Sequence, residues 1–231
     1  MKPKIGIIVP DRGDRPKLLE NCWRQIWAQT IKPTKVILVN DPAISADADI
    51  TWRYRKGYDA LRGEEIDIIF FMENDDWYAP NYLETMLAEW EKQGRPDMMG
   101  TIYTIYYHIR LFAYFTMHHH TRSSAMSTMI KPNLEIAWCS DNNPFTDLWL
   151  WQHLQVKKHL FKPDNHICMG MKHGDGLCGG NSHTDQLHRY TDGKGTPDPD
   201  KSFLKSVLDP EGFEFFSNYF NHANASSSEN L

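Results

Sequence analysis

The stretch Phe70-Phe71-Met72-Glu73-Asn74-Asp75-Asp76-Trp77-Tyr78 ends an apolar run, 66–72, with three acids in four positions. This pattern predicts a buried strand whose carboxyl end delivers carboxylates to a cleft, because open α/β sheets bind ligands at that end of their strands. Closely spaced carboxylates suit a hard divalent cation, Mg2+ or Mn2+, and such a cation suits a phosphate-bearing ligand. The stretch therefore predicts a class of fold and the place of its chemistry.

Strand-like and helix-like segments alternate on both sides of this stretch. Strands are expected at 5–9, 36–39 and 66–72, and helices, from apolar residues at steps of three and four, at 16–27, 51–61 and 80–90. Such alternation predicts a parallel sheet with right-handed crossovers. Because the carboxyl ends of its strands share one edge, we expect Asp11, Asp41 and Asp75 to converge on one crevice.

The second half of the chain is less regular. Strands are expected within 99–117 and at 126–130 and 166–171, and helices at 147–160, 202–208 and 213–220. Four glycines between Gly174 and Gly180 predict a loop. The tail 225–231 is polar and low in complexity, as an appended cloning remnant would be, and is set apart from the fold.

The composition is that of an ordinary globular protein. The chain has 231 residues, 41% of them hydrophobic and 24% charged, and a net charge of -5 that gives no overall basic footprint for nucleic acid. Its four cysteines lack the spacing of a zinc site. The apolar stretch 98–117 contains His108, Arg110 and four tyrosines, so no membrane insertion is expected. With no signal-peptide pattern at the start, a cytoplasmic location is expected.

Five short motifs occur in order between Ile7 and Leu83. They are Ile7-Ile8-Val9-Pro10, Arg15-Pro16-x-Leu18-Leu19, Ile26-x-Ala28-Gln29-Thr30, Val36-Ile37-Leu38-Val39-Asn40-Asp41 and Phe71-Met72-Glu73-Asn74-Asp75-Asp76-Trp77-Tyr78-x-Pro80-x-Tyr82-Leu83. Together they resemble the nucleotide-binding half of GT-A glycosyltransferases, family 2 most closely. The resemblance implies an α/β GT-A fold: a Rossmann-like, mostly parallel sheet with helices on both faces and a smaller mixed acceptor-side region. Residues 1–97 would form the nucleotide-sugar-binding half and 98–224 the acceptor-binding and catalytic half.

The resemblance also implies roles for single residues. Those expected to bind the donor are Pro10, Asp11, Arg12, Asp41, Arg55 and Asn74, with Asp41 facing the base, and Lys172 is suited to the charge of a diphosphate. Glu73 and Asp75 occupy the two acidic positions of the metal-binding D-x-D motif, and Asp75 would be the more direct ligand. Glu73 departs from the usual Asp, and Arg12-Gly13-Asp14 is one residue longer than the common form. Asp76 is expected to cap the helix that opens at Pro80.

Two further sites remain open between alternatives. His173 and His183 flank the glycine-rich loop, and either is a candidate to complete the metal shell. Thr146-Asp147-x-x-Leu150-Trp151-x-His153-Leu154 resembles the family's E-D-x-x-L-W-x-R-L, whose Asp is the catalytic base. This implies that Asp147 is the base, with Asp141 in reserve. Asp147 precedes an apolar-periodic run and is also suited to an N-cap.

The resemblance implies a metal-dependent glycosyltransferase that moves a sugar from a nucleotide sugar, UDP-glucose or similar, to an acceptor hydroxyl with inversion. The acceptor expected is a glycan or small molecule. A hydroxymethylated pyrimidine in DNA is the other possibility, because Glu-Asn-Asp-Asp-Trp-Tyr is faintly similar to base-J-type DNA glucosyltransferases. A nucleotidyltransferase would need a glycine-rich loop that 10–16 lacks. The alternative is a nucleotide-sugar-binding or glycan-binding module without catalysis. Oligomeric state is not predicted.

Overall fold

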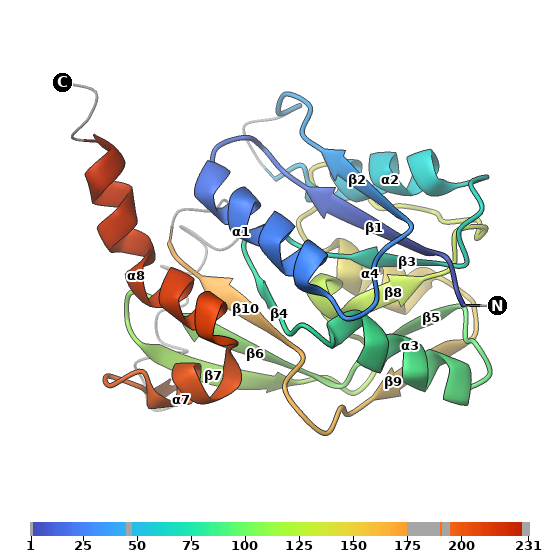
Figure 1. Cartoon of the computed structure of the whole chain (residues 1–231). Helices are drawn as coiled ribbons and strands as arrows, with labels where there is room; N and C mark the ends of the chain where they lie inside the picture. Colours follow the sequence, from blue (N-terminus) through green and yellow to red (C-terminus); the bar gives the residue numbers. More distant parts are fainter. Residues whose placement is uncertain (1, 45–47, 175–189, 191–194, 228–231) are drawn as a thin grey trace.

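The main feature of the fold is a six-stranded sheet (Figure 1). The computed structural model describes residues 2–44, 48–174, 190 and 195–227, and for 221–227 only the course of the backbone. In spatial order the strands are β2 (Lys35–Val39), β1 (Ile5–Pro10), β3 (Ile68–Phe71), β8 (Thr128–Ile130), β5 (Met98–Thr101) and β9 (Lys158–Phe161). Strand β8 runs antiparallel to both neighbours, and the other adjacent pairs are parallel.

Helices cover both faces of this sheet because successive strand residues point to opposite sides. Residues Ile7 and Val9 pack with α1 (Pro16–Ala28) and α3 (Tyr82–Lys92). Between them in the chain, Ile8 points to the other face and packs with α2 (Ile50–Leu61) and α4 (Thr146–His153). The predicted α/β fold, with a mostly parallel sheet and helices on both faces, is confirmed.

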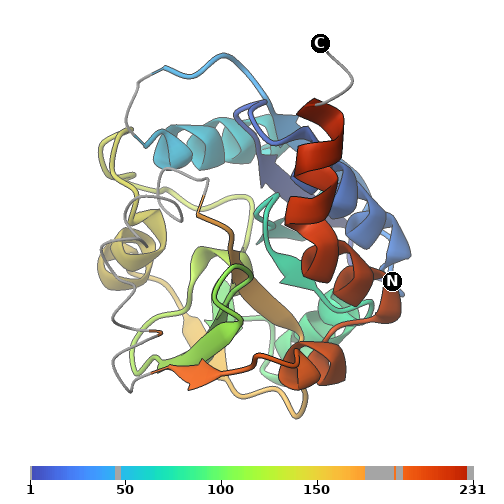
Figure 2. The same ribbon diagram turned by 90° about the vertical axis from the view of Figure 1, so that its left-hand side faces the viewer.

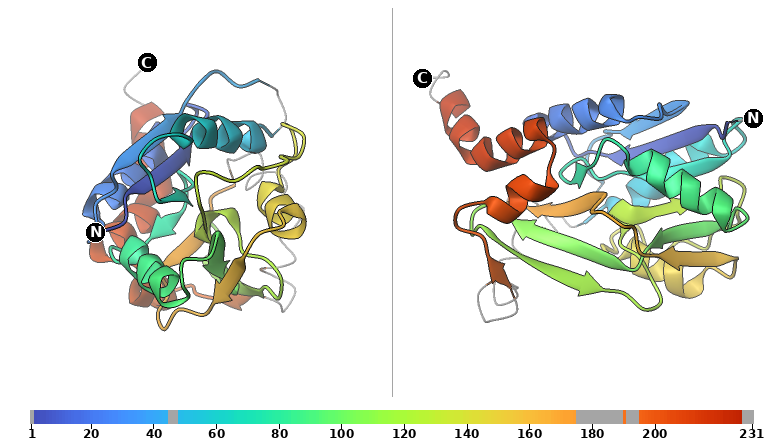
Figure 3. Two further views of the ribbon diagram at one scale, coloured as in Figure 1. Left: turned by 90° about the vertical axis from the view of Figure 1, so that its right-hand side faces the viewer. Right: turned by 60° about the horizontal axis from the view of Figure 1, so that its bottom comes forward.

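A smaller mixed sheet lies beside the main one (Figure 3). Its strands, in order, are β11 (Thr196–Pro197), β7 (Ala113–His118), β6 (Tyr103–His108), β10 (Cys168–Lys172) and β4 (Trp77–Tyr78). Helices α7 (Ser202–Val207) and α8 (Pro210–Ser227) close a third core over it. Strand β4 follows the acidic stretch directly and pairs with β10, so this stretch lies at the junction of the two sheets.

Helix α8 begins beside α1 (Figure 2) and then runs away from the body of the molecule (Figure 1). Arg24 on α1 joins the two through ion pairs with Asp209 at 3.2 Å and Glu211 at 2.8 Å. Because α8 extends to Ser227, residues 225–227 continue a helix of the domain. Within the described part of the chain, no helix combines the length and apolar character needed to cross a bilayer.

The expected helix over 147–160 is wrong in its second half. Helix α4 ends at His153, and residues from Lys158 form strand β9 at the edge of the main sheet. The reason is tertiary: β9 pairs with β5 in parallel register, from Met98 opposite Lys158 to Thr101 opposite Phe161. The backbone N–H and C=O groups of a short segment can form their hydrogen bonds either in a longer helix or with a neighbouring strand. Side-chain packing then decides which of the two forms. A 3-10 turn, η1 (Ala125–Ser127), leads into β8.

Candidate functional site

The acidic stretch after β3 lies beside the residue that follows β1, at the carboxyl edge of the main sheet. Asp11 is 3% exposed, and its backbone N–H donates to the Val39 carbonyl over 3.0 Å. Its carboxylate accepts hydrogen bonds from Asn74 Nδ2 at 2.6 Å and from the Gly13 backbone N–H at 3.1 Å. Gly13 has a φ of +78°, a conformation that favours glycine. The predicted meeting of Asp11 with the acidic stretch is therefore found, with Asn74 as the link.

Glu73, Asp75 and Asp76 form an acidic cluster, with one carboxylate oxygen of each within 4.8 Å of the others. Glu73 Oε1 accepts a hydrogen bond from the Tyr54 hydroxyl at 3.2 Å. Asp76 Oδ1 accepts one from the Met171 backbone N–H at 2.9 Å. Asp76 Oδ2 is buried and has no hydrogen-bond partner among the described residues. Oxygen atoms grouped in this way are the ligands that Mg2+ and Mn2+ prefer.

Asp76 is not the helix cap that the sequence predicts. Helix α3 begins after Asn81, whose side chain makes no capping hydrogen bond, and Asp76 is 1% exposed within the acidic cluster. The reason lies in β4, which inserts a strand pairing with β10 between the acids and the helix. This pairing turns Asp76 toward Met171 on β10 and away from α3.

The three carboxyls of the cluster differ in their pKa. Burial raises the pKa of Glu73, and the charge of Asp75 adds to the effect. Burial also raises the pKa of Asp76, with Glu73 and Asp75 acting in the same direction against the opposing charge of Lys172. At Asp75 burial is outweighed by Arg15 and His173, which hold its pKa well below the usual range. Asp75 is therefore charged near neutral pH, and a bound cation would offset the repulsion that raises the pKa of the other two carboxyls.

Three basic side chains surround Asp75. Arg15, just before α1, is ion-paired with its carboxylate. His173, after β10, is 1% exposed and has Nε2 at 3.2 Å from Asp75 Oδ2. Burial alone would lower the pKa of Lys172, but Asp76 and Asp75 reverse the effect and keep it protonated. The predictions that placed His173 and Lys172 near the acids therefore agree with the geometry, whereas His183 lies outside the described residues.

A buried arginine that the sequence interpretation missed holds the ends of β1 and β2 together. Arg53 on α2 is 1% exposed and bonds both oxygens of Asp49, at 3.1 and 2.8 Å. It also donates to the backbone carbonyls of Asp11, Val39 and Asp41. The spacing of Asp49 and Arg53, four residues apart at a helix start, was a signal for this pair. Arg12 lies beside this pair, with its Nη1 3.5 Å from Asp49 Oδ1.

Asp41 and Arg55 lie at the same edge but face other partners. The backbone carbonyl of Asp41 accepts from Arg53 at 3.1 Å. Its carboxylate pairs with Lys56, which lowers its pKa. Arg55 pairs with Asp141 at 2.8 Å, and both side chains are about one-third exposed. The two predicted residues Arg55 and Asp141 thus pair with each other rather than with the acidic cluster. Pro10 is buried as the last residue of β1.

Asp147 lies in the first turn of α4, after the N-cap residue Phe145. Its carboxylate is 16% exposed and accepts a hydrogen bond from Arg122 Nη1 at 2.9 Å. Burial raises the pKa of Asp147, against the lowering effect of Arg122. The negative charge of Asp147 also contributes to the raised pKa of Glu73, so the two carboxyls lie within electrostatic range of each other. A partly exposed carboxyl with a raised pKa is suited to accept a proton from a hydroxyl.

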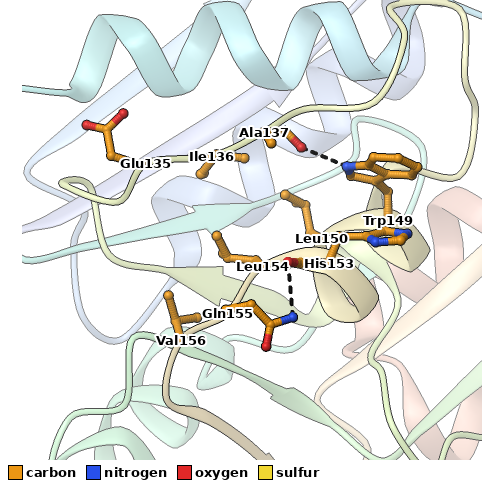
Figure 4. Close-up of a pocket in the computed structure, with 9 residues that line it drawn as sticks. All are labelled: Glu135, Ile136, Ala137, Trp149, Leu150, His153, Leu154, Gln155 and Val156. Atoms are coloured by element: carbon orange, nitrogen blue, oxygen red, sulfur yellow. Dashed lines mark hydrogen bonds between the residues drawn. The ribbon is translucent and has the colours of Figure 1, made fainter.

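A separate cavity of about 290 Å³ lies between α4 with the residues that follow it and the segment 135–137 (Figure 4). Trp149 and His153 form one wall, with ring centroids 4.0 Å apart, and Leu150 and Leu154 form the floor. The Trp149 indole N–H donates to the Ala137 carbonyl at 2.7 Å. None of the residues predicted to bind the donor or the metal, or to act as the base, lines this cavity.

Comparisons with known proteins give one sequence match and several distant structural likenesses. No family model matches the chain. It is 30% identical over 90 residues to "Putative glycosyltransferase EpsH" of Bacillus subtilis (strain 168), an alignment that covers 30% of this chain and only a quarter (25%) of that protein. Among solved structures, TarS 1-349 of S. aureus in complex with UDP is 14% identical, covers 73% of this chain and 60% of its own, and has a TM-score of 0.49.

A second structure, A197 from STIV, is 12% identical, covers 69% of this chain and 82% of its own, and has a TM-score of 0.43. The resemblance to glycosyltransferases that the motifs predict is confirmed over the matched part of the chain.

Proposed function

We propose that this protein is a glycosyltransferase that moves a sugar from a nucleotide sugar, specifically a UDP-sugar, to an acceptor hydroxyl. The observation that carries the proposal is the meeting of Asp11, Asn74, His173 and the acidic cluster at one sheet edge. Polar residues at the carboxyl edge of a parallel sheet are where such folds bind nucleotides. The 90-residue match to a glycosyltransferase supports the class of reaction.

The two ends of the donor fit two parts of this edge. The uracil and ribose would lie by Asp11 and Asp41, where Arg53 holds both backbone carbonyls. The diphosphate would lie by the acidic cluster, where Lys172 offers a buried positive charge. Phosphate groups next to three carboxyls need further positive charge to offset their mutual repulsion. This charge requirement favours a divalent cation in the complex.

The described residues fit a Mn2+ or Mg2+ ion. Asp75 is charged, and Asp76 Oδ2 is a buried oxygen with no hydrogen-bond partner among the described residues. Glu73 and His173 would complete a set of oxygen ligands with one imidazole, a set that suits Mn2+. When bound, the ion supplies positive charge that stabilises a diphosphate leaving group.

Asp147 is the residue proposed to act as the base. Its carboxylate would accept the proton of the acceptor hydroxyl as the oxygen forms a bond to the anomeric carbon. The bond between that carbon and the diphosphate oxygen breaks at the same time, and the electron pair leaves with the diphosphate. Attack from the face opposite the leaving group inverts the anomeric centre. Arg122 keeps the carboxylate in place through its 2.9 Å hydrogen bond.

The test is donor binding and turnover with a panel of nucleotide sugars, with and without Mn2+. We expect calorimetric binding of a UDP-sugar that needs Mn2+ and slow release of free sugar, with Asp75→Ala abolishing both. Asp59→Ala, an exposed acid on α2, is the matched control and should behave as wild type. Absence of binding to every nucleotide sugar, whether or not acceptor is added, would overturn the proposal.

The same turnover experiment, together with a gel shift, distinguishes the alternative function from catalysis and one class of acceptor from another. Donor binding without any sugar release would favour a binding module that lacks catalysis. Transfer to glycans or polyols would identify the expected acceptor class. A salt-sensitive gel shift with DNA that contains hydroxymethyluracil or hydroxymethylcytosine would favour the DNA acceptor.

A further inference from the structure

Arg15 lies where three chemically different groups of the site meet. Its guanidinium is ion-paired with Asp75, has Nη1 at 3.1 Å from His173 Nε2 and has Nη2 at 3.4 Å from Asn74 Oδ1. Asp75 Oδ2 and His173 Nε2 are themselves 3.2 Å apart. One arginine nitrogen therefore contacts both atoms that a cation held by Asp75 and His173 would use.

A guanidinium and a metal ion compete for these two atoms. A divalent cation would bind one carboxylate lone pair of Asp75 and the single lone pair of the unprotonated imidazole nitrogen of His173. That nitrogen lies 3.1 Å from Arg15 Nη1 and can serve only one of the two cations at a time. Two positive groups within a few ångströms also repel each other strongly in a buried site. Arg15 is 15% exposed and Asp75 is 16% exposed, so solvent screens this repulsion only in part.

Two further observations indicate that a metal ion can replace the Arg15 guanidinium at Asp75. Asp76 is 1% exposed, and its Oδ2 lies within the cluster with no hydrogen-bond partner among the described residues, so one ligand position remains open. Asp14 offers Arg15 a second carboxylate, 3.3 Å from its Nε and 52% exposed. The guanidinium therefore has a partner at the rim when it leaves Asp75.

We infer that Arg15 is a built-in counter-ion that occupies the atoms of Asp75 and His173 in the metal-free protein and competes with a divalent cation for them. The inference rests on the proposed function, because it assumes that these residues hold the metal. Metal binding then requires Arg15 to leave Asp75, while its contact with Asp14 can remain. Arg15 thereby weakens metal binding to the empty site, so that a donor and its cation are expected to bind together.

The test measures Mn2+ binding to the nucleotide-free protein by calorimetry and by the electron paramagnetic resonance signal of free Mn2+. In Arg15→Gln the competing charge is gone, and we expect the Kd for Mn2+ to fall by about tenfold or more. Arg24→Gln is the matched control, since Arg24 lies on the adjoining helix and pairs with Asp209 and Glu211 away from the cluster. Its Kd should equal that of wild type.

Two more variants serve as controls for misfolding and for a gain in affinity that does not involve Asp75. Arg15→Lys keeps a positive charge but loses the planar fork, so a smaller gain in Mn2+ affinity is expected, and it serves if Arg15→Gln does not fold. Adding Asp75→Asn to Arg15→Gln should remove the gain, because it removes the ligand that Arg15 masks. Circular dichroism checks the fold of each variant.

An unchanged or higher Kd for Mn2+ in both Arg15→Gln and Arg15→Lys would overturn the inference. The inference would also be overturned if neither wild type nor either Arg15 variant bound Mn2+. Both results are distinguishable from failure of the proposed function, which is read from the binding of nucleotide sugars. Tighter Mn2+ binding in Arg15→Gln without any nucleotide-sugar binding would support the inference and reject the proposed function.

Discussion

The two regions proposed to act in transfer, the acidic cluster and the pair of Asp147 with Arg122, are assembled differently. The cluster comes from one stretch of four residues at the end of β3. Asp147 and Arg122 are 25 positions apart and meet because α4 and the segment after β7 pack together. A strand end delivers neighbouring residues to one edge whatever surrounds it. A pair joined across loops depends on the packing of the whole second half.

Unlike the acidic cluster, the ends of β1 and β2 on the donor side depend on one buried side chain, that of Arg53. In Arg53→Leu, the buried carboxylate of Asp49 loses both hydrogen bonds, and three backbone carbonyls lose a donor. We expect the free energy of unfolding to fall by about 3–5 kcal/mol, as when a buried ion pair loses one partner. Urea unfolding followed by circular dichroism measures this.

Lys56→Gln on the same helix is the control for Arg53→Leu. Lys56 pairs with Asp41 at the surface, where the two side chains are 47% and 38% exposed, so its loss should leave the free energy of unfolding close to that of wild type. Equal effects of the two substitutions would mean that Arg53 does not hold the strand ends together.

On the acceptor side the largest expected effect is on turnover. Asp147→Asn removes the proposed base but leaves the acidic cluster intact, so kcat should fall by about 10²–10⁴-fold while the Kd of the donor stays the same. Asp59→Asn provides the isosteric control on an exposed helix surface. A kcat within twofold of wild type would exclude Asp147 as the base. Asp141→Asn would then be tested in the same way.

A smaller effect is expected from the partner of the base. Arg122 lowers the pKa of Asp147 against the effect of burial, so Arg122→Gln should raise that pKa. A base works when deprotonated, that is, above its pKa, and the acid limb of the pH–rate profile should therefore move to higher pH. Near neutral pH the loss of one charge-assisted hydrogen bond of about 1.5 kcal/mol should reduce kcat by about tenfold.

Arg62→Gln, which removes an exposed ion pair with Glu135, is the control and should leave the profile unchanged. An acid limb that stays in place in Arg122→Gln would show that Asp147 titrates independently of Arg122, or that another group carries the pH dependence. Either result would remove Arg122 from the proposed site.

Much of the donor side could be predicted from the sequence because its signals are local. An apolar run that ends in acids indicates a strand end, and the alternation of strands and helices predicts that such ends share one edge. Asp11 and Asn74 do meet there, over 2.6 Å. The role of Asp76 was predicted wrongly, because the pairing of β4 with β10 is a contact between residues far apart in the chain.

The sequence by itself determined the fold class and the edge at which the acids gather, since both follow from the period and polarity of short segments. Only the tertiary structure decided which charged groups face one another. It brought Arg15 and His173 to Asp75 across 60 and 98 positions of the chain, and Arg53 to the ends of β1 and β2. Buried charges must find partners wherever packing allows, and that choice depends on the whole fold rather than on any one segment.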